Sequence, residues 1–178
     1  MDAETKLKIY LIVLNRYKDL IGEKESHSVS IIRQRVSPYN NIIREIRDNI
    51  MSNFISYSYK NDFFNAAQDA INHIRKIETC EFAFTFWMDL KDIEELKVAT
   101  TYDKAIYLAA ILRSLGSEDV RVLVTNNDQQ YVRFSWNNDE YIFSPKSGSL
   151  LMGDDRLKLF ENDPVAYSFN DLVYETHD

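Results

Sequence analysis

The stretch ATTYDKAIYLAAILRSLG, residues 99–116, decides the fold of this chain, and VRVLVTNNDQQYVRFSWNNDEYIFSP, residues 120–145, continues it. Apolar residues recur at helical spacing through the first stretch until Gly116, and either Thr100 or Thr101 supplies a hydroxyl for the helix N-terminus. In the second stretch, apolar and polar residues alternate in three runs that two Asn-rich turns separate. The pattern predicts a capped apolar helix followed by a three-stranded meander.

Helical spacing upstream predicts three long helices. The first runs from about Ala3 to Ile21, the second begins at Ser37 and Pro38 and runs to about Tyr57, and Asp62 caps the third. The expected apolar faces of the first two consist of Leu7, Tyr10, Leu14, Tyr17 and Ile21, and of Ile42, Ile43, Ile46, Ile50 and Phe54. We therefore expect a helical N-terminal layer.

The shorter segments have weaker signals of secondary structure. The run VSIIRQRV (29–36) is long enough for two helical turns, and DLKDIEEL (89–96) predicts a short acidic helix before the central one. The run CEFAFTFW (80–87) fits either a strand or buried coil. After the meander, residues 146–178 are expected to be irregular, with a short helix and one edge strand.

Composition indicates a single unit. The chain has 178 residues, of which 45% are apolar, enough for a substantial core, and its 4 Gly and 3 Pro mark no linker. We treat 1–178 as one domain, with 1–60 as a helical extension and 61–178 as the core. One cysteine excludes an internal disulfide, and we expect a cytoplasmic protein with no membrane-spanning segment.

The charge balance is acidic. The chain carries 21 Lys and Arg against 28 Asp and Glu, a net charge of −7. Residues 1–98 hold 14 basic and 15 acidic residues, and residues 99–178 hold 7 and 13. This balance disfavours a general nucleic-acid or anionic-membrane binder.

The central region resembles the transglutaminase-like superfamily, whose fold is papain-like. Asp103, Lys104 and Ala105 match the start of that family's nucleophile helix, and Arg113, Leu115 and Gly116 fit its end. The resemblance implies an α+β fold in which the helical layer packs on a small antiparallel sheet. It also implies a Cys nucleophile, a His base and an orienting Asp at Thr101, Tyr131 and Ser144 in this sequence.

All three implied reactive positions are substituted. A thiol is an effective nucleophile because a neighbouring His holds it as thiolate, and a carboxylate orients that His. Thr101, Tyr131 and Ser144 do not reproduce this chemistry. The alternative interpretation is structural, with Thr101 as a helix cap, Tyr131 as a cross-strand aromatic residue and Ser144 as a turn residue.

Two other sets of residues are candidate sites. Cys80 lies seven residues after His73, a spacing that suits one helical face, although a lone Cys among aromatic residues is typically an inert core residue. Four arginines surround the Ser37–Pro38 turn and form a candidate phosphate or nucleic-acid patch; they are Arg33, Arg35, Arg44 and Arg47. The simpler interpretation is that they lie on exposed helix faces.

The prediction is a pseudoenzyme: a non-catalytic transglutaminase-like protein that binds a peptide or protein in the former active-site cleft. The cleft candidates are Thr101, Tyr102, Asp103, Tyr131, Arg133 and Ser144. The first alternative is an active hydrolase or acyl transferase with Cys80 or Thr101 as nucleophile; the second is nucleic-acid binding through the arginine patch. We expect no metal site and no cofactor, and the sequence does not specify the oligomeric state.

Overall fold

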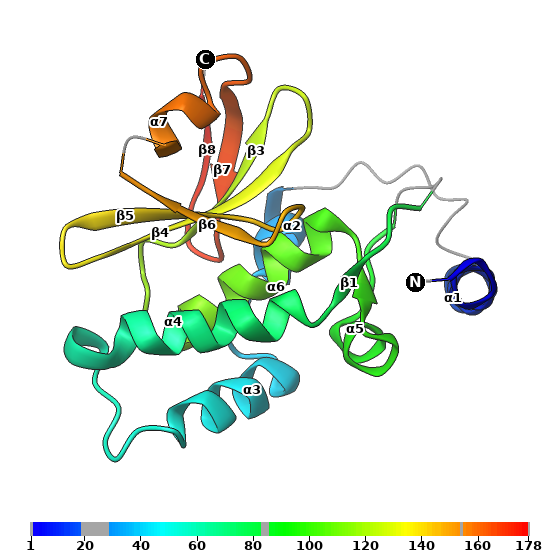
Figure 1. The fold of residues 1–178 in the computed structure, drawn as a ribbon, viewed down its shortest axis with the longest axis horizontal. Coiled ribbons are helices and arrows are strands. Elements are labelled where there is room, and N and C mark those ends of the chain that lie inside the picture. Colours follow the sequence, from blue (N-terminus) through cyan, green and yellow to red (C-terminus); the bar gives the residue numbers. More distant parts are fainter. Residues whose placement is uncertain (1, 19–28, 83–85, 154, 178) are drawn as a thin grey trace.

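A computed structural model of the chain describes residues 2–18, 29–82, 86–153 and 155–177. The fold is α+β: α6 lies beneath an antiparallel sheet, and both α4 and α3 pack against α6 (Figure 1). The helices are α1 (Ala3–Tyr17), α2 (Val29–Arg35), α3 (Asn41–Met51), α4 (Tyr59–Arg75), α5 (Leu90–Leu96), α6 (Thr101–Ser114) and α7 (Asp155–Leu159). The strands are β1 (Glu78–Thr79), β2 (Val98–Ala99), β3 (Arg121–Thr125), β4 (Gln130–Trp136), β5 (Asp139–Ser144), β6 (Ser149–Met152), β7 (Val165–Phe169) and β8 (Tyr174–Thr176).

Helix α6 is the centre of the molecule. Thr100 is its N-cap, and the Thr100 hydroxyl accepts a hydrogen bond from the Asp103 backbone N–H at 3.1 Å. Every residue from Asp103 to Leu112 is buried, because α3 and α4 cover one side of the helix and β3 and β4 cover the other. Gly116 follows the helix at φ +106°, a conformation that glycine adopts without strain, so the chain turns there toward β3.

The predicted meander is confirmed. Strands β3, β4 and β5 pair antiparallel in sequence order. A two-residue turn, Asn137–Asn138, joins β4 to β5, and both of its residues have positive φ (52° and 67°). Asparagine tolerates this conformation better than most residues, which explains why Asn-Asn stands between the two alternating runs.

The expectation for the C-terminal region is wrong about its strands, because the described part of residues 146–178 forms three strands instead of one. The sheet has the order β6-β5-β4-β3-β7-β8, so β6 and β8 are its edges and β7 is an internal strand. Strand β7 pairs with β3 and brings the fully buried Phe169 into the core. A buried strand such as β3 needs hydrogen-bonding partners along both edges, and the short VAYSF run supplies the second set.

Helix α1 packs on a face that matches the expected one only in part: Tyr17 is buried and Tyr10 packs against the core as expected. Ile9, Val13 and Tyr17 are buried, whereas Leu7 and Leu14 are exposed; Ile21 lies outside the described residues. The helix is anchored by polar contacts of its tyrosines and arginine. The Tyr17 hydroxyl donates to Asp92 at 2.6 Å and accepts from the Asp89 N–H at 2.8 Å, and Arg16 pairs with Asp92 and Glu95. These contacts to α5 fix which face turns inward.

The next two helices begin and end away from the expected residues. Helix α3 starts after Asn40, whose side-chain oxygen accepts from the Ile42 N–H at 2.9 Å, instead of at Ser37, and it ends at Met51. Helix α4 starts after Ser58 instead of Asp62; the Asp62 carboxylate reaches back to the Ser58 N–H at 2.9 Å. At α3 the Asn40 side chain caps the helix in place of Ser37. At α4 the Ser58 side chain forms no capping bond, and Asp62 bonds to the Ser58 N–H from within the first turn of the helix.

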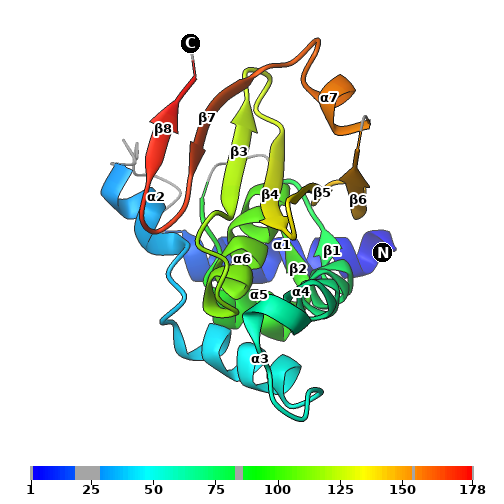
Figure 2. The same ribbon diagram turned by 90° about the vertical axis from the view of Figure 1, so that its left-hand side faces the viewer.

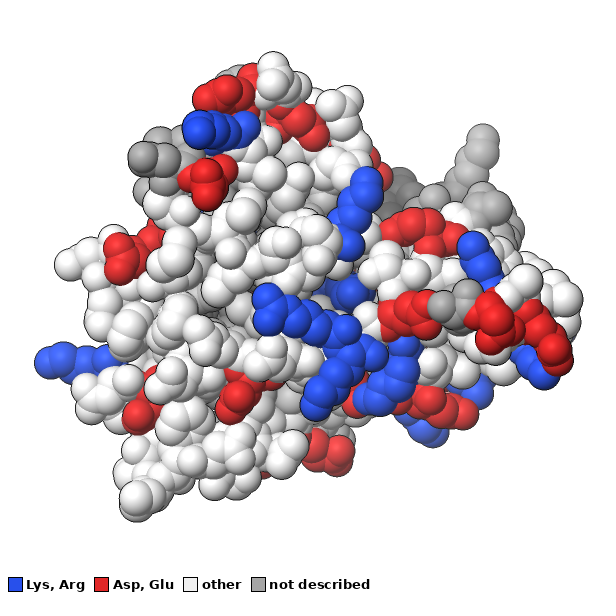
Figure 3. All heavy atoms as spheres, viewed as in Figure 1, with Lys and Arg blue, Asp and Glu red and all other residues white. Residues whose placement is uncertain are grey.

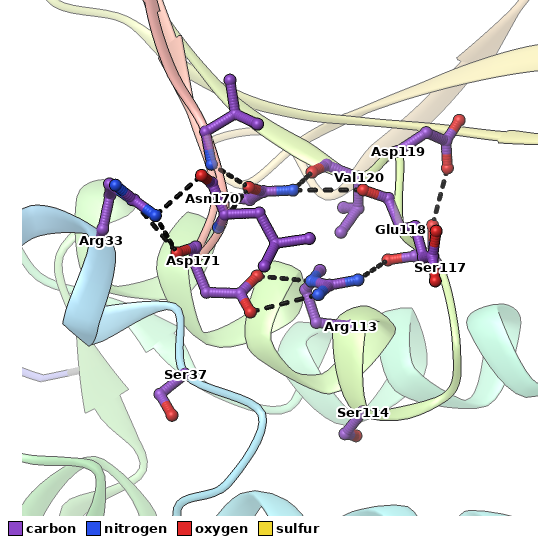
Figure 4. A network of polar contacts seen from close by, with 12 residues as sticks. Arg33, Ser37, Arg113, Ser114, Ser117, Glu118, Asp119, Val120, Asn170 and Asp171 are labelled. Atoms are coloured by element: carbon purple, nitrogen blue, oxygen red, sulfur yellow. Dashed lines mark hydrogen bonds and ion pairs between the residues drawn. The ribbon is translucent and has the colours of Figure 1, made fainter.

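A polar network ties the C-terminal hairpin to α6 and α2 (Figure 4). The Arg113 guanidinium donates to both carboxylate oxygens of Asp171, in the β7–β8 turn, and the two side chains are 10% and 14% exposed. Arg33 donates to the backbone carbonyls of Asp171 and Leu172 at 2.7–3.1 Å. The Asn170 side chain donates to the Val120 carbonyl at 2.9 Å. The network therefore closes the β7–β8 side of the sheet onto the helices.

Asp171→Asn should lower the free energy of unfolding by about 3 kcal/mol, because it leaves the Arg113 charge buried without its carboxylate partner. Urea denaturation measures this value. Asp48→Asn is the matched control, since it removes the Arg47–Asp48 pair, whose Asp side chain is 65% exposed, and should cost less than about 1 kcal/mol. Equal losses in the two variants would contradict the structural role given to the buried pair.

Candidate functional site

A pocket of about 640 Å³ opens at the N-terminus of α6. It is formed where α2, the segment before α5, the first turn of α6, the β3–β4 turn and β7 meet. This volume is in the range of small-ligand and peptide-side-chain pockets. The lining residues are Ile32, Glu81, Phe82, Phe86, Trp87, Thr100, Thr101, Tyr102, Asp128, Gln129, Gln130, Lys146 and Tyr167.

One wall of the pocket is aromatic. The rings of Trp87 and Tyr102 are nearly parallel, with centroids 6.2 Å apart and an angle of 6° between them. Tyr102 also stacks on Phe169 of β7, with centroids 6.3 Å apart, and burial raises the pKa of its hydroxyl. The Arg35 guanidinium lies 4.9 Å from the centre of the Trp87 ring. The stack is therefore anchored at both ends, in the sheet and in α2.

The opposite end of the pocket is polar. The Thr101 hydroxyl donates to the Gln130 carboxamide oxygen at 2.7 Å, and the Thr101 backbone N–H donates to the Glu81 carboxylate at 3.2 Å. The Gln130 amide in turn donates to the backbone carbonyl and the carboxylate of Asp128. These bonds link the start of α6 directly to the start of β4.

Asp163 holds the β3–β4 turn, which carries Asp128 and leads into Gln130. Its carboxylate accepts from the Thr125 hydroxyl at 2.6 Å and from the Asn127 N–H at 3.0 Å. Asp128 then adopts φ +56°, which an aspartate tolerates. The turn therefore holds Asp128 and Gln130 at the mouth of the pocket.

The structure does not bring the three expected triad positions together. Thr101 lines the pocket, but Tyr131 alternates with the buried Val132 that faces the helices, so Tyr131 lies on the other face of the sheet. There its ring meets Phe160 edge-on at 5.4 Å. Ser144 shares that outer face, because its neighbour Phe143 is the cross-strand partner of Val132.

The other expected cleft residues are likewise split between the pocket, the core beneath it and the outer face of the sheet. Tyr102 lines the pocket, whereas Arg133 lies on the outer face of the sheet beside Glu140, with 4.0 Å between the Nε and carboxylate oxygen atoms. Asp103 is buried beneath the pocket and accepts a hydrogen bond from the Thr100 hydroxyl at 2.8 Å. Burial raises the pKa of the Asp103 carboxyl to about 6.

The residue that meets Thr101 is Gln130, one position before the expected Tyr131. The alternation of β4 could have identified Gln130. It places Gln130 on the same face as Val132 and Phe134, the apolar residues that pack on the helices, and Tyr131 on the opposite face. Trp87 and Tyr167 were also missed as pocket residues. Nothing in their local sequence signals their proximity, since they come from segments far apart in the chain.

In the described structure neither candidate nucleophile forms a side-chain hydrogen bond to a base, although the Glu81 carboxylate accepts from the Thr101 backbone N–H. The Thr101 hydroxyl faces a carboxamide, which does not accept its proton. Cys80 is 3% exposed, and burial raises the pKa of its thiol. His73 instead forms a 2.9 Å hydrogen bond to Glu94. An unassisted hydroxyl and a buried thiol are both weak nucleophiles.

The Cys80 thiol should therefore react with a thiol reagent at pH 7 at least about a hundredfold more slowly in the folded chain than in the chain unfolded in urea. Because Cys80 is the chain's one cysteine, absorbance of the released thiolate from Ellman's reagent reports on it alone. Labelling of the folded chain as fast as that of the unfolded chain would show a reactive thiol and reopen Cys80 as a nucleophile.

The carboxylate of Glu94 is the centre of a cluster between α4, α5 and α6. It accepts hydrogen bonds from His73 at 2.9 Å, from the Tyr107 hydroxyl at 2.8 Å and from the Lys97 ammonium at 2.6 Å. Burial raises the pKa of Glu94, but these bonds outweigh it and lower the pKa to about 2. His73 therefore belongs to a structural cluster.

Glu94→Gln should lower the free energy of unfolding at pH 7 by about 2 kcal/mol, because it weakens three bonds to a charged acceptor. The folded-state pKa of about 2 lies below the usual glutamate value of 4.5, so this stability is present above about pH 4.5 and is lost as the pH falls toward 2. Urea denaturation from pH 7 to pH 2 should show the two proteins converging at low pH. Glu95→Gln, on the more exposed neighbour, is the control; a wild-type advantage that persists unchanged at pH 2 would contradict the assignment.

Three of the four arginines of the candidate patch are engaged within the molecule. Arg33 binds backbone carbonyls, Arg35 stacks on Trp87 and Arg47 pairs with Asp48, while Arg44 is exposed. On the face shown in Figure 3, Lys and Arg gather near the middle, with Asp and Glu on both sides. Among the described residues there is no group of three or more His, Cys, Asp or Glu that could hold a metal ion. None of the described helices is long and apolar enough to cross a membrane.

The comparisons with known proteins add no assignment: no protein-family model, no curated protein and no solved structure matches the chain.

Proposed function

We propose that the chain is a non-catalytic binding module that takes a peptide segment of a partner protein into the pocket at the N-terminus of α6. The proposal rests on the combination of groups that line this pocket. An open pocket of about 640 Å³ has an aromatic wall and hydrogen-bonding groups, while the hydroxyl at the expected nucleophile position, Thr101, donates to the Gln130 carboxamide, which is not a base.

The form of the pocket supports a peptide ligand. Two turns on its rim, the β3–β4 turn and the β5–β6 turn that carries Lys146, present backbone and side-chain polar groups. The aromatic wall offers rigid apolar surface, which provides binding free energy at little cost in side-chain entropy. A peptide side chain enters such a site while its backbone remains on the rim.

The transglutaminase-like resemblance is part of the proposal. The order of elements supports it, since a short helix (α5) precedes the central helix and an antiparallel meander follows. In this interpretation Thr101 occupies the nucleophile position and Gln130, instead of Tyr131, occupies the base position. The former catalytic cleft then becomes a ligand pocket, and the protein is a pseudoenzyme.

Selection of a random heptapeptide library on the immobilised chain tests the proposal. We expect enriched peptides whose affinity falls at least tenfold in Gln129→Trp, because Gln129 lines the pocket and an indole there fills it. Asn127→Trp is the matched control, since Asn127 lies in the same turn but outside the pocket lining, and it should change the affinity less than twofold. Fluorescence polarisation of a labelled peptide measures both.

Two results would overturn the proposal. One is a library from which no peptide is enriched. The other is a set of enriched peptides that bind Gln129→Trp as tightly as the wild type, which would place binding elsewhere on the surface. Near-identical thermal unfolding of the two tryptophan variants would show that both remain folded.

A further inference from the structure

At the polar end of the pocket, the hydrogen-bond donors of Thr101 and Gln130 are already bonded within the protein, whereas several acceptor oxygens are free to bind a ligand. The Thr101 backbone N–H is used by Glu81, the Thr101 hydroxyl hydrogen by Gln130, and the Gln130 amide by Asp128. A carboxylate has about four lone-pair sites, so Glu81 and Asp128 both keep acceptor capacity after these bonds. The Thr101 oxygen also keeps its lone pairs. A ligand at this end therefore has to supply donors.

The charges around the pocket favour a cation. Glu81 and Asp128 are two exposed carboxylates, and Lys146 is the only cationic side chain among the described lining residues. The Lys146 ammonium donates to the Gln129 side-chain oxygen at 3.3 Å, at the outer rim. An anion entering this end would meet two like charges, whereas an ammonium or guanidinium would meet two opposite charges.

The aromatic wall favours the same kind of group. The faces of Trp and Tyr rings carry negative electrostatic potential and attract cations. The Arg35 guanidinium already makes this kind of contact with Trp87, 4.9 Å from the ring centre, so Tyr102 and Tyr167 are the electron-rich rings of the described lining left for a ligand cation. Phe82, Phe86, Tyr102 and Tyr167 supply further aromatic surface for the methylene groups of a long basic side chain.

We propose that the pocket binds a basic segment of a partner protein and that a Lys or Arg side chain of this segment enters it. The aliphatic part of that side chain lies along the aromatic wall, and its charged end donates to Glu81, Asp128 and the Thr101 oxygen. This inference rests on the proposed function, because it specifies which peptides the same pocket takes.

The test uses the peptides enriched in the heptapeptide selection. We expect them to share a Lys or Arg position, and replacement of that arginine by citrulline, which keeps its shape but not its charge, should weaken binding at least tenfold. The double variant Glu81→Gln, Asp128→Asn should weaken binding of the basic peptide by a similar factor. Asp139→Asn with Glu161→Gln makes the same charge change at two exposed sites outside the pocket lining and should change the affinity less than twofold.

Two outcomes would overturn the inference. In the first, neutral or acidic peptides are enriched equally, or the citrulline peptide binds as well as the arginine peptide. In the second, the two double variants weaken binding equally, which would show general attraction to an acidic chain of net charge −7. Binding that still falls in Gln129→Trp would then uphold the pocket as a peptide site, so the two proposals fail separately.

Discussion

The burial of α6 on every side is the constraint on which the rest of this structure depends. An ordinary surface helix buries one stripe, but here every side chain from Asp103 to Leu112 is enclosed. Two of them, Asp103 and Lys104, are residues that are ordinarily charged. The Lys104 ammonium donates to the Ile77 carbonyl and the Thr79 hydroxyl, both at 3.0 Å, and burial lowers its pKa. Such a helix is stable only with helices on one side and a sheet on the other, and both layers are present (Figure 2).

The same constraint determines where a site can form. Because the length of α6 is covered, its N-terminal turn is the part that reaches a pocket, beside the turns at the ends of the strands. There the helix start, the β3–β4 turn and the segment before α5 converge on Thr101 and Gln130. The network of Arg113 and Asp171 closes the β7–β8 hairpin over the same helix, and this keeps Tyr167 in the pocket wall.

Most of the central region could be predicted from the sequence, because its signals are local. The Thr100 cap, the apolar repeat, Gly116 and the Asn137–Asn138 turn each act within a few residues of the chain. The position of β7 and the inward face of α1 depend on partners far along the chain, so local spacing revealed neither in full. The site was predicted only in part, because some of its residues come from distant parts of the chain. Thr101 and Tyr102 were named through the family resemblance carried by the residues that follow them in α6, but the pairing of Thr101 with Gln130 required knowing which face of β4 meets the helix.

The most direct test of this account is to map the bound peptide on the isotope-labelled chain by NMR. The account predicts that the largest shifts on peptide addition fall on the backbone amides of Thr101, Tyr102 and Gln130 and on the indole N–H of Trp87. These groups surround the pocket on the helix side of the sheet. Shifts concentrated instead on Tyr131 and Arg133, on the outer face, would contradict it and show that the ligand binds on the opposite face of the sheet.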